Sequence, residues 1–306
     1  MADATTQETL VTPQAPPRFA LASLLAANAL LALGPLFVRM SDVGPVAAAF
    51  WRMGLALPLI ALMARLLPHR PSRIGRGLAI VIALSGVLFA ADLASWHLGI
   101  VRTKMANATL FGNSASLIYP VYGFLAARAW PSRMQGIALL LAAAGAALLM
   151  GRSAELSPEH LLGDLLSLLA GMFYAAYFVA IARARETLSP LPLLAASTLA
   201  SVAPLLALAW AMGDRILPGD WTPLLALAIG SQVIGQGLMV YALGRMSPLV
   251  IGLALLTQPV VAASVGWLIY GEGLGALDFA GAAMIGLALV LVRQPEKRLS
   301  AAGRTA

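Results

Sequence analysis

The sequence predicts an all-α integral membrane protein in which ten transmembrane helices form two inverted repeats of five helices around a central cavity. Two observations carry this prediction, namely the hydropathy of the chain and a match between its two halves. Of the 306 residues, 60% are hydrophobic and only 11% are charged, whereas a soluble domain has about 25% charged residues. The mean hydropathy is +0.86.

Ten apolar windows are each long enough to cross a bilayer, which takes roughly 20 residues. They cover approximately residues 18–39, 44–66, 77–99, 104–126, 132–151, 160–182, 189–212, 221–244, 247–270 and 275–293. We therefore expect a first repeat over 18–151 and a second over 160–293, flanked by tails at 1–17 and 294–306. The polar segment 1–17 has no basic n-region and no apolar h-region, so no cleaved signal peptide is expected.

The two halves match in residue type at a spacing of 145 positions, without a gap, from about residue 44 to about residue 145. Pro45 matches Pro190, and Asn113 matches Gln258. Each half contains an odd number of windows, so the second half enters the membrane upside down relative to the first. Inverted repeats of this kind are typical of secondary transporters, in which one site opens to either side.

Local residues support these windows. A proline stands at the expected first helical position of three of them, where its missing N–H costs little. These prolines are Pro45, Pro190 and Pro248. Small residues allow helices to approach closely in lipid, and we expect such contacts at Gly136, Gly145, Gly281 and Gly286.

The net charge of +7 reflects topology and does not predict a nucleic-acid partner. With ten spans, the side that holds both termini carries 14 Lys and Arg residues and the other side carries 5. The positive-inside rule then places both termini in the cytoplasm, and the membrane is expected to be a bacterial inner membrane. The chain has no cysteine and three scattered histidines, so we expect no disulfide and no metal site. It also lacks a Walker motif and is not expected to use ATP or another cofactor directly.

Several motifs resemble the EamA repeat of the drug/metabolite transporter (DMT) superfamily. The second half contains YALGRMSPLVIGLALLTQP from Tyr241 to Pro259, then Tyr270-Gly-Glu272; the first half has Arg52 and later ANATL from Ala106. The likeness spans about residues 18–293 and is nearest to the YddG-type aromatic amino-acid exporters. It implies alternating-access export of small metabolites, above all neutral and aromatic amino acids, and no enzymatic activity.

Two departures from the pattern separate the first copy from the second. The first copy has Ser114 where the second has Pro259, and Ala127 where the second has Glu272. Because EamA motifs are shared by exporters of many metabolites, an exporter of another metabolite or drug is the alternative. We expect a small-molecule substrate, a lipid bilayer and a monomeric chain.

Charged and aromatic residues within the third window predict part of a substrate site. Phe89, Asp92 and Trp96 follow each other at i, i+3 and i+7, so they share one helix face. The carboxylate could hold a substrate ammonium beside an aromatic side chain. Alternatively, Asp92 pairs with Arg52 as a structural contact or a gate, because both lie at a similar depth, roughly 9–12 Å inside the outer boundary.

Amides and a tyrosine within the spans complete the candidate set. A polar side chain is costly in lipid, so each is expected to face the interior of the bundle. Gln258 and Asn113 could orient a zwitterion, whereas the amides of the eighth window bind either substrate or a neighbouring helix. Asp164 is expected at the rim near water. The candidate substrate-binding residues beyond Phe89, Asp92 and Trp96 are Asn113, Tyr174, Gln232, Gln236 and Gln258.

An intramembrane enzyme is a remote alternative. Gly112-Asn-Ser114 resembles the nucleophile setting of rhomboid-type serine proteases, and His97 lies in the preceding window. A serine and a histidine could together attack a peptide carbonyl. However, His97 is expected at the outer end of its span and Ser114 deep inside the next one. A purely structural or receptor protein would not explain the inverted repeat.

Overall fold

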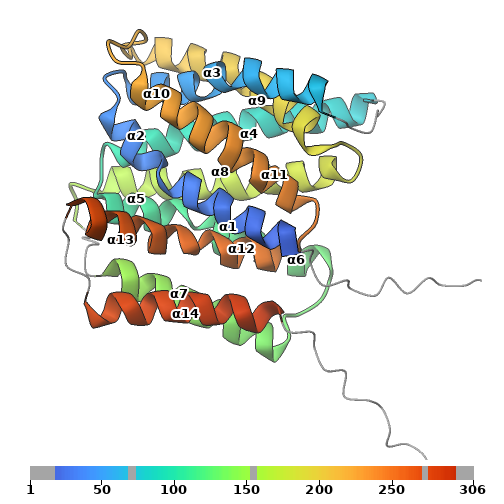
Figure 1. Ribbon diagram of the computed structural model, residues 1–306, viewed down its shortest axis with the longest axis vertical. Coiled ribbons are helices and arrows are strands. Elements are labelled where there is room, and N and C mark those ends of the chain that lie inside the picture. Colours follow the sequence, from blue (N-terminus) through green and yellow to red (C-terminus); the bar gives the residue numbers. More distant parts are fainter. Residues whose placement is uncertain (1–17, 68–73, 152–156, 271–274, 294–306) are drawn as a thin grey trace, which may run out of the picture.

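The computed structural model describes residues 18–67, 74–151, 157–270 and 275–293, and these residues form helices and no strand (Figure 1). The expected tails 1–17 and 294–306 and the Gly271–Glu272 pair of the motif lie outside the described residues. Helices of the first half are α1 (Arg18–Ala32), α2 (Gly34–Met40), α3 (Pro45–Leu66), α4 (Arg76–Ile100), α5 (Met105–Gly112), α6 (Ala115–Ala126) and α7 (Arg133–Gly151).

The second half has a similar order, except that its first span is one continuous helix and its third span is divided. Its helices are α8 (Leu161–Arg185), α9 (Pro190–Ala211), α10 (Thr222–Ala226), the π-helix η1 (Leu227–Gln236), α11 (Gly237–Leu243), α12 (Pro248–Leu255), α13 (Thr257–Tyr270) and α14 (Ala276–Arg293). Every apolar window of the sequence is therefore helical. Pro45, Pro190 and Pro248 begin α3, α9 and α12, as expected from their missing N–H groups.

Seven helical segments in the described part are long and apolar enough to cross a membrane. They are Phe19–Met40, Pro45–Leu66, Arg76–Ile100, Leu161–Arg185, Pro190–Ala211, Thr222–Leu243 and Pro248–Val265. Two shorter apolar helices, Arg133–Leu149 and Ala276–Val292, accompany them. The α5–α6 segment is divided at Asn113 and Ser114. The protein is thus a multi-pass membrane protein.

Several helices are interrupted within the bundle. The α1–α2 break lies at Leu33, just before Pro35, which cannot donate a backbone hydrogen bond. The α12–α13 break lies at Leu256, shortly before Pro259. In η1 the backbone widens to a π-helix, a rare conformation that is frequent at functional sites. Interrupted helices free backbone groups, which membrane proteins tolerate where the chain faces protein or a cavity.

Three pairs of corresponding spans pack against each other: α3 on α9, α7 on α14, and the α5–α6 span on the α12–α13 span through α6 and α12. Figure 1 shows α7 and α14 side by side at one edge of the bundle. There the backbones meet at Gly145 and Gly281: a Cβ on Gly281 would lie 2.5 Å from the Gly145 carbonyl oxygen. The expected glycine contacts are thus present at these two positions. At Gly136 and Gly286 an added Cβ would meet nothing within 4 Å.

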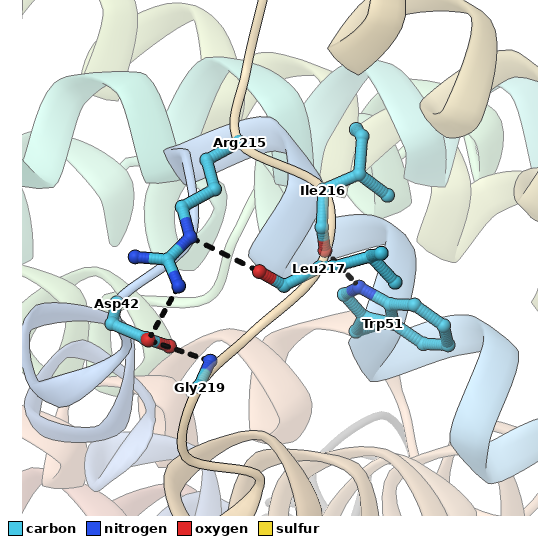
Figure 2. A network of polar contacts seen from close by, with 6 residues as sticks. All are labelled: Asp42, Trp51, Arg215, Ile216, Leu217 and Gly219. Atoms are coloured by element: carbon cyan, nitrogen blue, oxygen red, sulfur yellow. Dashed lines mark hydrogen bonds and ion pairs between the residues drawn. The ribbon is translucent and has the colours of Figure 1, made fainter.

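The connection between α9 and α10, in the second half of the chain, binds to residues around the start of α3, in the first half (Figure 2). Asp42 accepts a hydrogen bond from the Gly219 N–H at 2.7 Å and forms an ion pair with Arg215 at 3.5 Å. The Trp51 indole donates to the Ile216 carbonyl at 2.6 Å, and its ring packs edge-on against Trp221, with centroids 4.9 Å apart. These contacts join the two halves at the side of the bundle opposite to the start of α1.

Candidate substrate cavity

A cavity lies among α1, α2, α3, α4, α5, α8 and α13, with about 600 Å³ of empty space that is partly open to the surroundings. Arg52 and six of the predicted substrate-binding residues line it; the six are Phe89, Asp92, Trp96, Asn113, Tyr174 and Gln258. Most other lining side chains are apolar, which is typical of small-molecule sites. Gln232 and Gln236 are not in the lining but hydrogen-bond to residues that are.

The predicted face of α4 forms one wall of this cavity. Phe89, Asp92 and Trp96 all point into it, as their helical spacing requires. The Trp96 ring has room because two neighbouring positions lack side chains. A Cβ on Gly34 would lie 3.2 Å from the Trp96 ring, and a Cβ on Gly112 would lie 2.9 Å from its Nε1. Trp96 is therefore a packed cavity wall in this structure.

Arg52 is held in place by neutral partners. Its Nε donates a hydrogen bond to Gln232 Oε1 at 3.3 Å, and Gln232 Nε2 in turn donates to Thr198 Oγ1 at 3.2 Å. The guanidinium carbon lies 5.8 Å from the centroid of the Phe89 ring, within the range of a cation–π contact. Gln232 therefore orients Arg52 from behind the cavity wall.

Asp92 and Arg52 are both buried, with 8% and 3% of their surfaces exposed. Their charges interact electrostatically, but among the described side chains Asp92 has no hydrogen bond and no ion pair, with Arg52 or otherwise. Both side chains face the same cavity. A carboxylate and a guanidinium of opposite charge are therefore available to one bound molecule.

Two of the lining residues, Phe89 and Tyr174, belong to a cluster of aromatic rings. The rings of Phe89 and Tyr177 stack with centroids 4.4 Å apart, and those of Tyr174 and Phe178 lie 4.2 Å apart. Behind these rings, Tyr174 donates a hydrogen bond to Gln236 Oε1, and Gln236 Nε2 donates to the Tyr177 hydroxyl, both at 3.2 Å. Gln236 thus fixes the two tyrosines rather than lining the cavity itself.

Gln258 is oriented by Asn28, a residue that the sequence analysis did not single out. Gln258 Nε2 donates to Asn28 Oδ1 at 2.8 Å, and Asn28 Nδ2 donates to the Leu24 carbonyl at 2.8 Å. Asn28 is fully buried in α1. The signal was present in the sequence, because an amide in the middle of an apolar span is costly unless it faces the protein interior.

A second buried carboxylate, Asp164, lies outside the cavity lining. Asp164 lies in the first turn of α8, at the end of its span as expected, but it does not face water, because only 6% of its surface is exposed. Asp164 accepts hydrogen bonds from Thr103 Oγ1 at 2.6 Å and from Asn107 Nδ2 at 3.0 Å. These donors come from the start of α5 and the turn before it, so Asp164 ties α8 to that segment.

Ser114 and His97 do not form the hydrogen-bonded pair that a serine protease requires. His97 Nδ1 lies 2.9 Å from the Pro45 carbonyl oxygen, so this nitrogen is the donor. His97 Nε2 and Ser114 Oγ are buried and have no hydrogen-bond partner in the described part of the chain. Ser114 packs against Gly171, where there is no room for a side chain. The two residues lack the arrangement needed for nucleophilic attack.

The fold and the cavity together define a multi-pass membrane protein of the transporter class. The sequence profile of the EamA-like transporter family matches residues 18–151 and 161–294. The chain therefore belongs to the EamA-like transporter family, within the DMT superfamily, whose members are transporters and not enzymes.

Comparison with solved structures shows a similar fold and nothing about function. One solved structure, titled "Crystal structure of protein", is 18% identical, with a TM-score of 0.70 over 89% of this chain and 96% of that chain. No protein of curated function matches the sequence significantly.

Proposed function

We propose that this transporter exports small metabolites, above all neutral and aromatic amino acids, from the bacterial cytoplasm by alternating access. The carrying observation is that Arg52 and Asp92 line one cavity without an ion pair between them. An amino acid has an ammonium and a carboxylate group, which match these two charges. A buried charge is costly unless it is paired, so a zwitterion would stabilise both side chains at once.

The rings around the charges support an apolar or aromatic substrate side chain. Trp96, Phe89 and Tyr174 line the cavity together with Leu31 and Leu93. Aromatic rings supply a large contact area and favour offset or edge-to-face contact with another ring. Asn113 and Gln258 add hydrogen-bonding groups at the interrupted helices.

The arrangement of the halves supports alternating access between two inverted repeats of five spans. Corresponding spans pack on each other in three pairs, α3 on α9, α7 on α14, and the α5–α6 span on the α12–α13 span through α6 and α12, as expected around a pseudo-twofold axis. The first turn of α1 and the last turn of α14 lie at the same side of the bundle (Figure 1). Together with the charge bias of 14 to 5, this favours cytoplasmic termini in the inner membrane.

Transport by the purified protein in liposomes tests the proposal. We expect saturable uptake of L-phenylalanine and weak uptake of 3-phenylpropionate and 2-phenylethylamine, which each lack one of the two charges. Empty liposomes and the double variant Arg52→Gln/Asp92→Asn are the controls. Repeating the assay with an imposed pH gradient separates proton coupling from downhill transport. Uptake of a single-charged or uncharged solute without phenylalanine uptake would instead assign the protein to export of another metabolite or drug.

A further inference from the structure

The Gln258 amide is the end of a chain of hydrogen bonds whose direction is set by a backbone carbonyl. The Leu24 carbonyl oxygen can only accept, so the Asn28 group that meets it at 2.8 Å must be the Nδ2 donor. Asn28 then presents its Oδ1 to Gln258. Because Oδ1 can only accept, Gln258 must meet it with Nε2, again at 2.8 Å.

Because Nε2 of the Gln258 amide binds Asn28, the other polar atom of this amide is its carbonyl oxygen, Oε1. Gln258 is half-buried and lines the cavity. Among the described residues, no side chain donates a hydrogen bond to Gln258 Oε1, and this atom is not one of the buried polar atoms left without a partner. The oxygen is accordingly accessible, and it belongs to a side chain that lines the cavity.

We propose that Asn28 is a positioning residue that turns the Gln258 oxygen into the cavity, where it accepts a hydrogen bond from the substrate ammonium. This inference rests on the proposed amino-acid export. The Asp92 carboxylate and the Gln258 oxygen then give the cavity two acceptors for the substrate ammonium. Arg52 is left to bind the substrate carboxylate. A reversed Gln258 amide would instead present two N–H donors, which would repel an ammonium group.

Selectivity between L-phenylalanine and 3-phenylpropionate measures this role, because the two probes differ by the ammonium group. The wild type is expected to favour phenylalanine. In Asn28→Leu, the Gln258 amide loses its fixed direction, and the uptake ratio should fall roughly ten- to hundredfold, the range for one hydrogen bond to a charged group. Asn28→Asp should keep the selectivity, because a protonated aspartate in this buried place both donates to Leu24 and accepts from Gln258.

A double-mutant cycle shows whether Asn28 acts through Gln258. Gln258→Leu should lower the same ratio, and adding Asn28→Leu to it should have no further effect. Asn28→Ala removes the amide with a smaller side chain and replaces Asn28→Leu if that variant does not fold. Selectivity that survives in Asn28→Leu or Asn28→Ala, or additive losses in the double variant, would overturn the positioning role while leaving amino-acid export intact. Absence of phenylalanine uptake by the wild type would overturn the proposed function, and this inference with it.

Discussion

The carboxylate of Asp214 caps the first turn of α3, although 168 residues separate it from Val46. Its Oδ2 accepts hydrogen bonds from the backbone N–H groups of Val46 at 2.8 Å and of Ala47 at 2.9 Å. The first N–H groups of a helix have no partner within the helix, so a cap of this kind satisfies two of them. Here the cap comes from the other half of the chain and holds the halves together.

Replacing Asp214 with alanine should therefore destabilise the protein by about 0.5–2 kcal/mol, as for loss of other N-terminal caps. Thermal unfolding of the purified protein in detergent measures the change. Glu159→Gln, a change at an exposed carboxylate, is the matched control. Equal melting temperatures of Asp214→Ala and the wild type would mean that the cap contributes nothing to stability.

The close backbone contact between α7 and α14 gives a second prediction. Gly281→Ala would place a Cβ 2.5 Å from the Gly145 carbonyl oxygen, and forcing a methyl group into a packed contact costs about 1–3 kcal/mol. We expect a lower melting temperature and less folded protein in the membrane. Gly286→Ala is the control on the same helix, because an added Cβ there meets nothing within 4 Å. Similar behaviour of the two variants would rule out the contact as the cause.

Topology can be tested by single cysteines, because the chain has none of its own. Cysteines at Thr5 and Arg298 should resist a membrane-impermeant thiol reagent in intact cells, since the charge bias places both tails in the cytoplasm. A cysteine at Glu155, in the connection between the halves, should react readily. Labelling of the tails from outside would reverse the proposed orientation.

Single and double substitutions of the two charged cavity residues, Arg52 and Asp92, test whether they bind substrate or pair with each other. Asp92→Asn should express normally and lose most phenylalanine uptake, because Asp92 forms no hydrogen bond or ion pair with another described side chain. Arg52→Ala should also lose uptake, and adding it to Asp92→Asn should not restore uptake. If the two residues instead depend on each other as an ion pair, breaking it costs about 3–5 kcal/mol, and the double variant should recover expression relative to the single ones.

Substitutions of Trp96 and Gln236 should distinguish a residue that contacts the substrate from one that supports the cavity wall. Trp96→Ala removes a ring from the cavity wall and should lower phenylalanine uptake at near-normal membrane expression. Gln236→Ala leaves the hydroxyls of Tyr174 and Tyr177 without this partner, so it should lower the melting temperature as well as uptake, at a cost of about 1–3 kcal/mol. Uptake rates and unfolding measured on the same preparations distinguish the two effects. Unchanged uptake by both variants would exclude either residue from the transport site.

The apolar helices and most of the cavity wall could be predicted from the sequence, because hydropathy and helical periodicity depend on local residues. The spacing of Phe89, Asp92 and Trp96 fixed their common face, and all three line the cavity. By contrast, the amides of Gln232 and Gln236 were expected on an inward face, and the sequence could not show whether that face meets substrate or protein. Their orientation depends on Thr198 and Tyr177, which come from other helices.

Other features depend on contacts between segments far apart in the chain and were not predicted. The π-helix η1 lies within a window whose hydropathy is typical of an ordinary α-helix. Asp164 is near the end of its span, but the donors Thr103 and Asn107 bury it. Arg52 forms no ion pair with Asp92 and instead donates a hydrogen bond to a neutral partner, Gln232, which lies 180 residues further along the chain.

The packing of α7 on α14 constrains the order of events during biosynthesis. The helix that completes the first half, α7, packs mainly against the last helix that the structure describes, α14, with the closest contact at Gly145 and Gly281. Until α14 has been synthesised and inserted, the glycine-bearing face of α7 is exposed to lipid or to membrane insertion factors. This contact between the halves therefore forms only after α14 has been inserted, late in the assembly of the bundle.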